Sequence, residues 1–405
     1  MLTYKIGISA QEHDDFVKMS QQTNLLQSSS WAKIKDNWGN ERIGFYKEDR
    51  LVATASILIK PLPLGFTMLY IPRGPIMDYQ DKELVAFVMS SLKAFGKRQK
   101  AVFVKFDPSL YLRQYLIAHQ GETNQDTLAI ISDLQKLGVD WTGETSDLAE
   151  NIQPRFQANI YAEHFSFEKL PKRTQKIIQN ARHKGVTIEF GASNLVAEFT
   201  QLMKKTENRK QISLRGQEYY QKLLDTYGQD AYITMARLDV VEKQKQTQAE
   251  LNKAKEMQAT FTENTRKTKV AQVEKDILRL ESDLAFFNQQ IDSGKTKVAL
   301  AATLSINFGT TSENIYAGMD DDFKVYNPAL LTWYETAVHA FQQGIIWQNM
   351  GGIENNLEGG LYNFKSKFNP VIEEFAGEFN LPVNSLLYKL TNFAYKVRKK
   401  IRASR

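Results

Sequence analysis

The predicted fold is organised around residues 298–370, which contain VALAATLSINFG (298–309), ENIYAGMDDDF (313–323), NPALLTWYETAVHAF (327–341) and IIWQNMGGIENNLEGGLYNFKSKFNP (345–370). Two apolar runs separated by a turn predict adjacent strands. A helix is predicted to begin at Asn327-Pro328, and a third short apolar run ends at a glycine pair. This strand, strand, helix, strand order leaves a glycine-rich loop free to hold a ligand.

That loop returns into three polar residues, Tyr362, Lys365 and Lys367, which alternate with Phe364 and Phe368. Aromatic side chains interleaved with lysines, directly after a flexible loop, could present fixed cations at the rim of a cleft. There they would meet an anionic or polarised substrate. A turn followed by a half-exposed strand explains the same residues equally well.

Length and composition bound the class of protein. The chain has 405 residues, 42% of them hydrophobic and 24% charged, which predicts a globular protein of two or three domains. No apolar run approaches the roughly 20 residues that cross a bilayer, and the N-terminus lacks a signal-peptide pattern, so we expect a cytoplasmic protein. The absence of cysteine excludes disulfides, thiolate zinc sites and a cysteine nucleophile. Five scattered histidines predict no metal site, and we expect no cofactor.

The net charge of +6 is local rather than global. Residues 388–405, YKLTNFAYKVRKKIRASR, carry seven Lys or Arg and no acidic residue, so the rest of the chain is close to neutral. Apolar residues at three- and four-residue spacing predict an amphipathic helix with a cationic face. Such a helix suits the anionic inner face of the cytoplasmic membrane. A helix docked on the core, with a solvated charged end, is the alternative.

Residues 1–152 are predicted to form an α+β domain. The predicted order is strand, helix, short helix, three antiparallel strands, helix, strand and closing helix, at 3–9, 10–21, around Trp31 to Trp38, 42–48, 51–60, 67–72, 82–99, 101–107 and 127–139. Ser29 or Ser30 is the expected N-cap of the short helix. Apart from the short and closing helices, this is the order of an acyltransferase-like domain.

A second unit is predicted from residue 153, with a strand in PRFQANIYAE and a helix at 169–184 that carries six Lys or Arg. Its basic stripe could follow a phosphate backbone, or it could be an ordinary solvated face. Arg215, Tyr219 and Tyr220 sit at the opening of a later helix, where Arg215 could hold a phosphate.

The composition changes at residues 239–293, which are rich in Lys, Glu and Gln. The second half follows a heptad spacing through Val270, Val273, Ile277, Leu280 and Leu284. Two such helices predict an antiparallel coiled-coil hairpin. Because the flanking strands both look like core strands of one sheet, we expect the hairpin to be an insertion in the second domain.

Taken in this order, NLLQSSSWAKIKDNW (24–38), YAGMDDDF (316–323), NPALLTWYETAVHAF (327–341) and GGLYNFKSKFNP (359–370) resemble the Fem family of peptidoglycan aminoacyltransferases. The resemblance covers essentially the whole chain and is greatest to the MurM type. It implies two domains like the acyl-CoA N-acyltransferases (GNAT-like), at 1–152 completed by 377–405 and at 153–376, with the coiled-coil hairpin inserted in the second.

The resemblance also implies a reaction, in which serine or alanine moves from aminoacyl-tRNA to the stem-peptide lysine amine of lipid II. Addition of the second bridge residue is the alternative within the family. The site residues that the resemblance implies are Lys35 and Arg215 for the diphosphate of the precursor, Trp38 and Tyr219 beside them, Lys365 for the oxyanion or the tRNA terminus, and Asp107 and Tyr316 facing the acceptor peptide.

These residue types fit the chemistry. An aminoacyl ester is already activated, so positioning, a neutral amine and one stabilised oxyanion suffice. The acceptor amine has a pKa near 10.4, about the usual value for lysine, so desolvation or a nearby base must make it neutral. Asp107 is a candidate, as are the tRNA terminal hydroxyl and the phosphates.

Two other classes of protein fit this pattern less well. Acyl-CoA transferases need a glycine-rich pyrophosphate turn after a core strand, and Met350-Gly351-Gly352 departs from that pattern, so a CoA enzyme is not expected. A non-enzymatic adaptor that binds RNA or membranes leaves the cationic residues unexplained.

Overall fold

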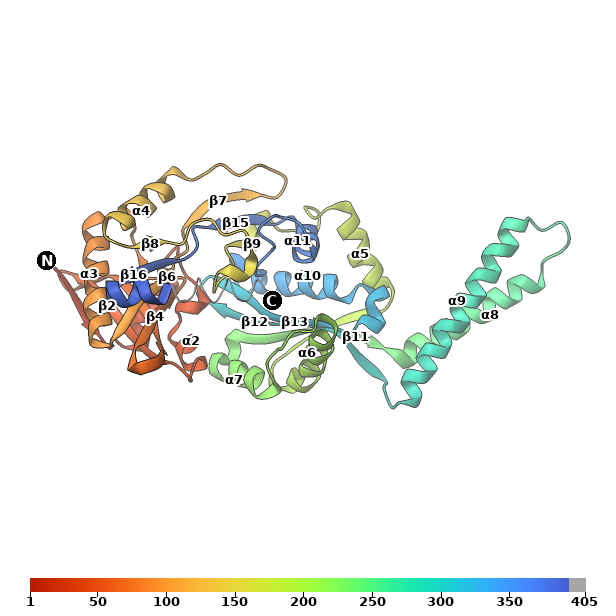
Figure 1. Ribbon diagram of the computed structural model, residues 1–405. Helices are drawn as coiled ribbons and strands as arrows, with labels where there is room; N and C mark the ends of the chain where they lie inside the picture. Colours follow the sequence, from red (N-terminus) through yellow and green to blue (C-terminus); the bar gives the residue numbers. More distant parts are fainter. Residues whose placement is uncertain (393–405) are drawn as a thin grey trace.

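The computed structural model describes residues 1–392 and contains two mixed sheets that lie side by side (Figure 1). The predicted α+β class is confirmed. Most of the basic run predicted at 388–405 lies outside the described residues. Within residues 1–392, we find no helix with both the length and the apolar character needed to cross a bilayer.

The first sheet has the strand order β1-β2-β3-β4-β6-β16-β8, with β5 paired to β3. β4 and β6 are parallel and the other pairs are antiparallel. The strands are β1 (Leu2–Ile6), β2 (Gly39–Lys47), β3 (Arg50–Pro61), β4 (Thr67–Pro72), β5 (Ile76–Met77), β6 (Ala101–Asp107), β8 (Asp140–Trp141) and β16 (Phe379–Pro382).

Four helices accompany this sheet, and each begins at a polar N-cap. They are α1 (Ala10–Met19), α2 (Ser29–Ile34), α3 (Lys82–Arg98) and α4 (Gln125–Lys136). Ser28 caps α2 by accepting the backbone N–H of Trp31 at 3.1 Å, one residue before the predicted cap. The apolar face of α3 packs on β3, β4 and β6 and forms the first core with them. α2 contacts β3 of this sheet.

The second sheet has the order β10-β11-β12-β13-β14-β9-β15-β7. β13 and β14 are parallel, as the predicted helical crossover between them requires. The strands are β7 (Tyr111–Leu116), β9 (Phe156–Tyr161), β10 (Val186–Gly191), β11 (Ala231–Asp239), β12 (Lys297–Phe308), β13 (Thr311–Met319), β14 (Trp347–Asn349) and β15 (Val371–Phe375). The predicted adjacency of the strands at 298 and 313 is therefore confirmed.

Each sheet contains a strand from the far side of residue 152. β7 lies at the edge of the second sheet, and β16 lies inside the first. Arg113 on β7 donates to Glu374 on β15 at 2.6 Å, and Arg155 donates to the same carboxylate at 2.5 Å. The ion pair of Arg113 and the ladders of β7 and β16 cross between the units, so side chains and backbone both tie the two units together.

Helices cover both faces of the second sheet. α5 and α10 pack on one face, and α6 and α7 pack on the other (Figure 1). The helices are α5 (Lys172–His183), α6 (Val196–Lys210), α7 (Gln217–Tyr227), α10 (Pro328–Gln342) and the short α11 (Gly360–Lys365). α7 also contacts α2, which brings the two units together at one point.

The alternative of a half-exposed strand at 362–368 is wrong. This segment is α11 followed by a 3₁₀ turn at Ser366–Phe368. The carboxylate of Glu354 accepts the backbone N–H groups of Leu361 and Tyr362 at 3.0 and 2.9 Å. It therefore satisfies two of the free donors that open a helix, which an extended chain would not present together.

Two long helices, α8 (Val240–Ala259) and α9 (Lys267–Asp292), lie between β11 and β12 and extend away from the body (Figure 1). We call residues 240–292 the helical arm. Leu251, Val273, Ile277 and Leu280 are buried between its two helices. Asp239 begins α8 by accepting the backbone N–H of Glu242 at 2.9 Å. Since Asp239 also pairs with Lys297, the arm leaves and re-enters the sheet at neighbouring positions.

Candidate functional site

A cavity of about 490 Å³ lies where α2 of the first unit meets α7 of the second. Four of the predicted site residues line it: Lys35, Trp38, Arg215 and Tyr219. They come from positions some 180 residues apart, and the contact between α2 and α7 brings them together. We call this space the interdomain cavity.

Lys35 and Arg215 are the two free cations of the interdomain cavity. Burial lowers the pKa of Lys35 below its ordinary value, and the nearby charge of Arg215 lowers it further. Lys35 Nζ lies 5.2 Å from the ring centre of Trp31, and Arg215 Cζ lies 5.2 Å from that of Tyr219. Within residues 1–392 neither cation forms an ion pair with a carboxylate. Two like charges held this close favour an anionic ligand between them.

The remaining charges at this cavity are nearly balanced. Lys222 Nζ lies 2.6 Å from Asp36 Oδ2, so that pair is already satisfied. Glu218 also lines the cavity, in the first turn of α7. Lys60 Nζ lies 5.3 Å from the ring centre of Trp38. The unmatched positive charge therefore belongs to Lys35 and Arg215.

Asp107 does not line the interdomain cavity but lies one side chain behind it. Its carboxylate is 1% exposed and accepts the Tyr70 hydroxyl at 2.8 Å and the Arg73 backbone N–H at 2.6 Å. Burial raises the pKa of Asp107 to about 6, against the opposing effects of the Arg73 charge and of these hydrogen bonds. Tyr70 itself lines the cavity, and Gln153 donates to its hydroxyl at 3.3 Å.

Tyr316 supports the cavity wall from behind. Its ring centre lies 6.2 Å from that of Tyr219 and 5.1 Å from that of Tyr220, both in edge-on contact. Tyr316 is not among the lining residues. Its position therefore fixes the ring on which the Arg215 guanidinium rests.

Lys365 lies apart from the other predicted residues, at the end of α11. Its side chain is 4% exposed, and Nζ donates to the carbonyl of Gly352 at 2.7 Å. Burial lowers the pKa of Lys365 to about 7, although the charge of Glu354 opposes the shift. A methyl group on Gly352 would lie 2.6 Å from Pro154, the residue after Gln153. Gly352 therefore lies between Lys365 and Pro154, and Pro154 adjoins Gln153 in the lining of the interdomain cavity.

A groove of about 540 Å³ runs beside α11. It is lined by Arg173 and Thr174 of α5 and by Phe364 and Lys367, and none of its lining residues is acidic. Thr174 donates to the carbonyl of Lys367 at 2.9 Å, which joins α5 to the segment that follows Lys365. Arg173, one residue of the basic stripe predicted on α5, thus borders this groove, which we call the α5 groove.

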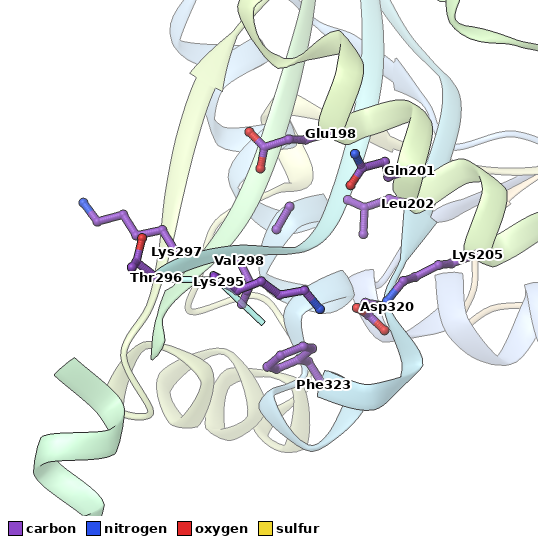
Figure 2. Close-up of a pocket in the computed structure, with 12 residues that line it drawn as sticks. Glu198, Gln201, Leu202, Lys205, Lys295, Thr296, Lys297, Val298, Asp320 and Phe323 are labelled. Atoms are coloured by element: carbon purple, nitrogen blue, oxygen red, sulfur yellow. Dashed lines mark hydrogen bonds and ion pairs between the residues drawn. The ribbon is translucent and has the colours of Figure 1, made fainter. Parts of the chain in front are cut away.

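Another cavity, of about 320 Å³, lies at the root of the helical arm (Figure 2). Its charges are largely matched within the protein. Lys205 pairs with Asp320, and Glu198 receives two bonds of 2.8 Å from Arg237. Lys295 donates to Gln290 at 2.9 Å. We do not place the functional site there, because little charge remains for a ligand. Across residues 1–392 no cluster of acidic and histidine side chains is placed to hold a metal ion.

Three residues of this region, Tyr70, Arg73 and Gln153, were not predicted from the sequence. A signal for the first two exists, because β4 and β6 are parallel neighbours and Pro72 pairs with Asp107. The carboxyl ends of parallel strands meet at one edge of a sheet, so residues after β4 must approach Asp107. Predicting that parallel pair would have identified Arg73. Gln153 carries no comparable signal.

Comparison with known proteins identifies the family. The FemAB family model matches residues 8–396. The chain is 27% identical over 412 residues to the lipid II:glycine glycyltransferase of Staphylococcus aureus (strain MRSA252), covering 95% of this chain and 94% of the relative. It is 26% identical over 411 residues to that of Staphylococcus haemolyticus (strain JCSC1435), with the same coverage. A crystal structure of FemX superposes with a TM-score of 0.75 at 25% identity, covering 96% of this chain and 99% of the other. The predicted resemblance is confirmed, and the chain belongs to the FemAB family.

Proposed function

We propose that this protein is a lipid II aminoacyltransferase, which moves serine or alanine from aminoacyl-tRNA to the side-chain amine of the stem-peptide lysine. It would thereby build the cross-bridge of branched peptidoglycan. Membership of the FemAB family supports the reaction class, and the names of its relatives support lipid II as the acceptor. The observation that carries the proposal is the meeting at one cavity of Lys35 and Arg215, two cations that have no carboxylate partner among residues 1–392.

The interdomain cavity suits the diphosphate of the acceptor. The planar Arg215 guanidinium offers a fork to one phosphate, and the Lys35 ammonium offers a point charge to the next. Contacts with Tyr219 and Trp31 hold both cations in place before the ligand arrives. Trp38 completes the wall beside them. Little side-chain freedom is then lost on binding.

The α5 groove suits the donor. Arg173 and Lys367 would meet phosphates, and Phe364 offers an aromatic face on which a base can stack. Lys365 follows Phe364 in α11 and is not itself a lining residue of the groove. In protonated form Lys365 would stabilise the oxyanion that develops on the ester carbonyl.

The reaction needs no covalent intermediate. The neutral acceptor amine attacks the ester carbonyl, an N–C bond forms, and the C–O bond to the tRNA terminal ribose breaks. The attacking nitrogen loses one proton, and the departing oxygen gains one and leaves as a hydroxyl, so no net proton is released and Asp107 ends the turnover ionised. Because Asp107 is buried, we assign its proton transfer to a relay: the amine proton passes to the Tyr70 oxygen while the Tyr70 proton passes to Asp107.

Three further assignments belong to this proposal. The units at 1–152 with 377–405 and at 153–376 are GNAT-like domains, supported by the place of β16 in the first sheet. The helical arm is an antiparallel coiled coil that contacts tRNA, supported by the apolar seam of Leu251, Ile277 and Leu280. The basic run at 388–405 holds the protein at the cytoplasmic face of the membrane, supported by its seven unopposed charges.

The test is transfer of radiolabelled serine, alanine and glycine from their charged tRNAs to lipid II. Wild type is compared with Lys35→Ala and Lys365→Ala, and we expect product with serine or alanine that is lost in both variants. Product from glycine alone would correct the donor. Product only from lipid II that already carries one bridge residue would indicate a second-position enzyme. No product from either acceptor would favour the adaptor.

A further inference from the structure

Leu64 is the most exposed leucine in the described part of the chain, at 93% of its surface. It lies at the tip of the β3–β4 loop, residues 62–66, with a left-handed backbone (φ 63°) that a leucine seldom adopts. The loop is held at its base, where Leu62 N–H donates to the carbonyl of Phe66 at 2.8 Å. Leu62 and Phe66 pack into an apolar cluster of the first unit. The fold therefore presents Leu64 to solvent on a fixed support.

A second apolar row lies beside this loop. Residues 385–392 are helical, and Tyr388 and Leu387 pack into the same cluster as Leu62 and Phe66. Leu386 and Leu390, four residues apart and so on one face of the helix, point outward and are 70% and 56% exposed. Neither core packing nor the interdomain cavity accounts for this exposed surface.

Cations surround these leucines. The segments 60–66, 97–100 and 384–390 contain five Lys or Arg and no carboxylate: Lys60, Lys97, Arg98, Lys100 and Lys389. Lys97 and Lys100 line one hollow together with Phe66 and Asn384, which places them beside the loop and the helix. Asp140 is a carboxylate that approaches this region, near Tyr388. Exposed leucines ringed by cations complement an anionic lipid surface.

We propose that these three segments form a membrane-binding face, in which Leu64 inserts among the acyl chains of an anionic bilayer and the surrounding cations meet its headgroups. We call residues 60–66, 97–100 and 384–390 the lipid face. The charge balance favours this occupant over a second copy of the chain, because two copies of the same cationic face would repel each other.

The lipid face adjoins the interdomain cavity. Trp38 lines that cavity and also packs in the cluster that contains Leu62, Phe66 and Leu387. Lys60 of the lipid face lies over the Trp38 ring. Resting on the proposed function, the lipid face would hold the cavity at headgroup depth, where the diphosphate of a lipid-linked acceptor lies while its hydrocarbon stays in the bilayer.

The test is co-sedimentation of the full chain with vesicles of equal parts phosphatidylglycerol and phosphatidylcholine. Leu64→Asn should lower the partition coefficient roughly tenfold, the effect of losing one inserted leucine. Asparagine tolerates the left-handed backbone, so this variant should fold. The joint change of Lys97 and Lys100 to Gln should lower the partition coefficient about fivefold for each lysine removed. Met19→Asn, at a residue 89% exposed on α1, is the control and should leave partition unchanged.

Unchanged partition of Leu64→Asn would overturn the proposal. So would a concentration-dependent dimer in wild type that Leu64→Asn abolishes, because the occupant would then be a second copy. Transfer to an acceptor with a short, water-soluble prenyl chain separates the two proposals. With that soluble acceptor, the activity of Leu64→Asn should match that of wild type. The activity of Leu64→Asn should fall below wild type only when the acceptor is embedded in vesicles. Absence of transfer by wild type to either acceptor would contradict the proposed function and leave the vesicle result standing.

Discussion

The hydroxyl of Tyr70 stands between Asp107 and the interdomain cavity, because it donates to Asp107 Oδ2 at 2.8 Å while the tyrosine ring lines the cavity wall. A carboxylate with a pKa of about 6 is ionised at neutral pH and can accept a proton through this hydroxyl. The relationship makes Tyr70 the residue through which Asp107 acts on a ligand. It also makes the effect of pH on the reaction predictable.

Tyr70→Phe should lower kcat and remove the acidic limb of the pH–rate profile. A phenylalanine ring cannot pass a proton to Asp107, so the remaining rate no longer depends on the ionisation of that carboxyl. The measurement is kcat from about pH 5 to about pH 9. Tyr46→Phe, which removes a hydroxyl bonded to Glu12 of α1, is the control. A limb that stays in place would remove Asp107 from the proton path.

Lys35→Ala and Arg215→Ala should each raise KM for the acceptor by about 10- to 100-fold, the usual worth of a hydrogen bond to a charged group. The KM for aminoacyl-tRNA should not change. The double variant should cost less than the product of the two single effects, because both cations hold one ligand. Lys222→Ala is the matched control, since Asp36 already engages that amine. An equal effect in the control would point to general electrostatics rather than a diphosphate site.

Lys365→Met should lower kcat by roughly 100- to 1,000-fold with little change in the KM of the acceptor, as expected for loss of one oxyanion donor. In wild type the rate should fall as pH rises through about 7, where the buried amine loses its proton. That alkaline limb should be absent from Lys365→Met. The control is Lys136→Met, at a surface lysine paired with Asp133. Persistence of the limb in Lys365→Met would assign it to another group.

Glu313 should make the protein less heat-stable as pH rises. Burial raises its pKa to about 7 from an ordinary 4.5, so the folded state holds the proton more tightly than the unfolded chain. Its contribution is complete below about pH 4.5 and is lost as pH rises through about 7, a change of about 3 kcal/mol in the free energy of unfolding.

Glu313→Gln removes the charge that must be buried at high pH. Its Tm should therefore fall less than that of wild type between about pH 5 and about pH 8, as measured by calorimetry. Glu122→Gln, at an exposed position, should follow wild type. Parallel Tm curves for wild type and Glu313→Gln would show that another group carries the pH dependence.

The sequence predicted local structure better than contacts between distant segments. The ββαβ order at 298–370 and the site pair Lys35 and Arg215 followed from periodicity and family motifs. Three features did not. β7 joins the second sheet through the ion pairs of Arg113 with Glu374, which no local pattern encodes. Asp107 ends its strand as predicted, but its burial depends on Tyr70, 37 residues away in the chain. α11 begins where Glu354 folds back onto its first N–H groups.

Removal of the outer part of the helical arm tests the role of the arm in binding tRNA. Gln244 of α8 donates to Asn288 of α9 at 3.2 Å, so the two helices can be joined by a short turn beyond this pair. Replacing 251–281 with a four-residue turn removes the seam of Leu251, Val273, Ile277 and Leu280. It keeps Val240 and Phe287, which are buried in the core of the second unit. The Tm should therefore stay close to that of wild type.

If the arm contacts tRNA, this deletion should raise KM for aminoacyl-tRNA about tenfold or more. The dependence of that KM on salt concentration should not become steeper, because phosphate contacts are lost rather than gained. The KM for the acceptor should be unchanged, because α2 and α7, which meet at the interdomain cavity, lie away from the arm (Figure 1). A short acceptor-stem RNA that cannot reach the arm is the matched substrate: wild type and deletion should use it equally. Equal use of full-length tRNA as well would assign the arm a structural role.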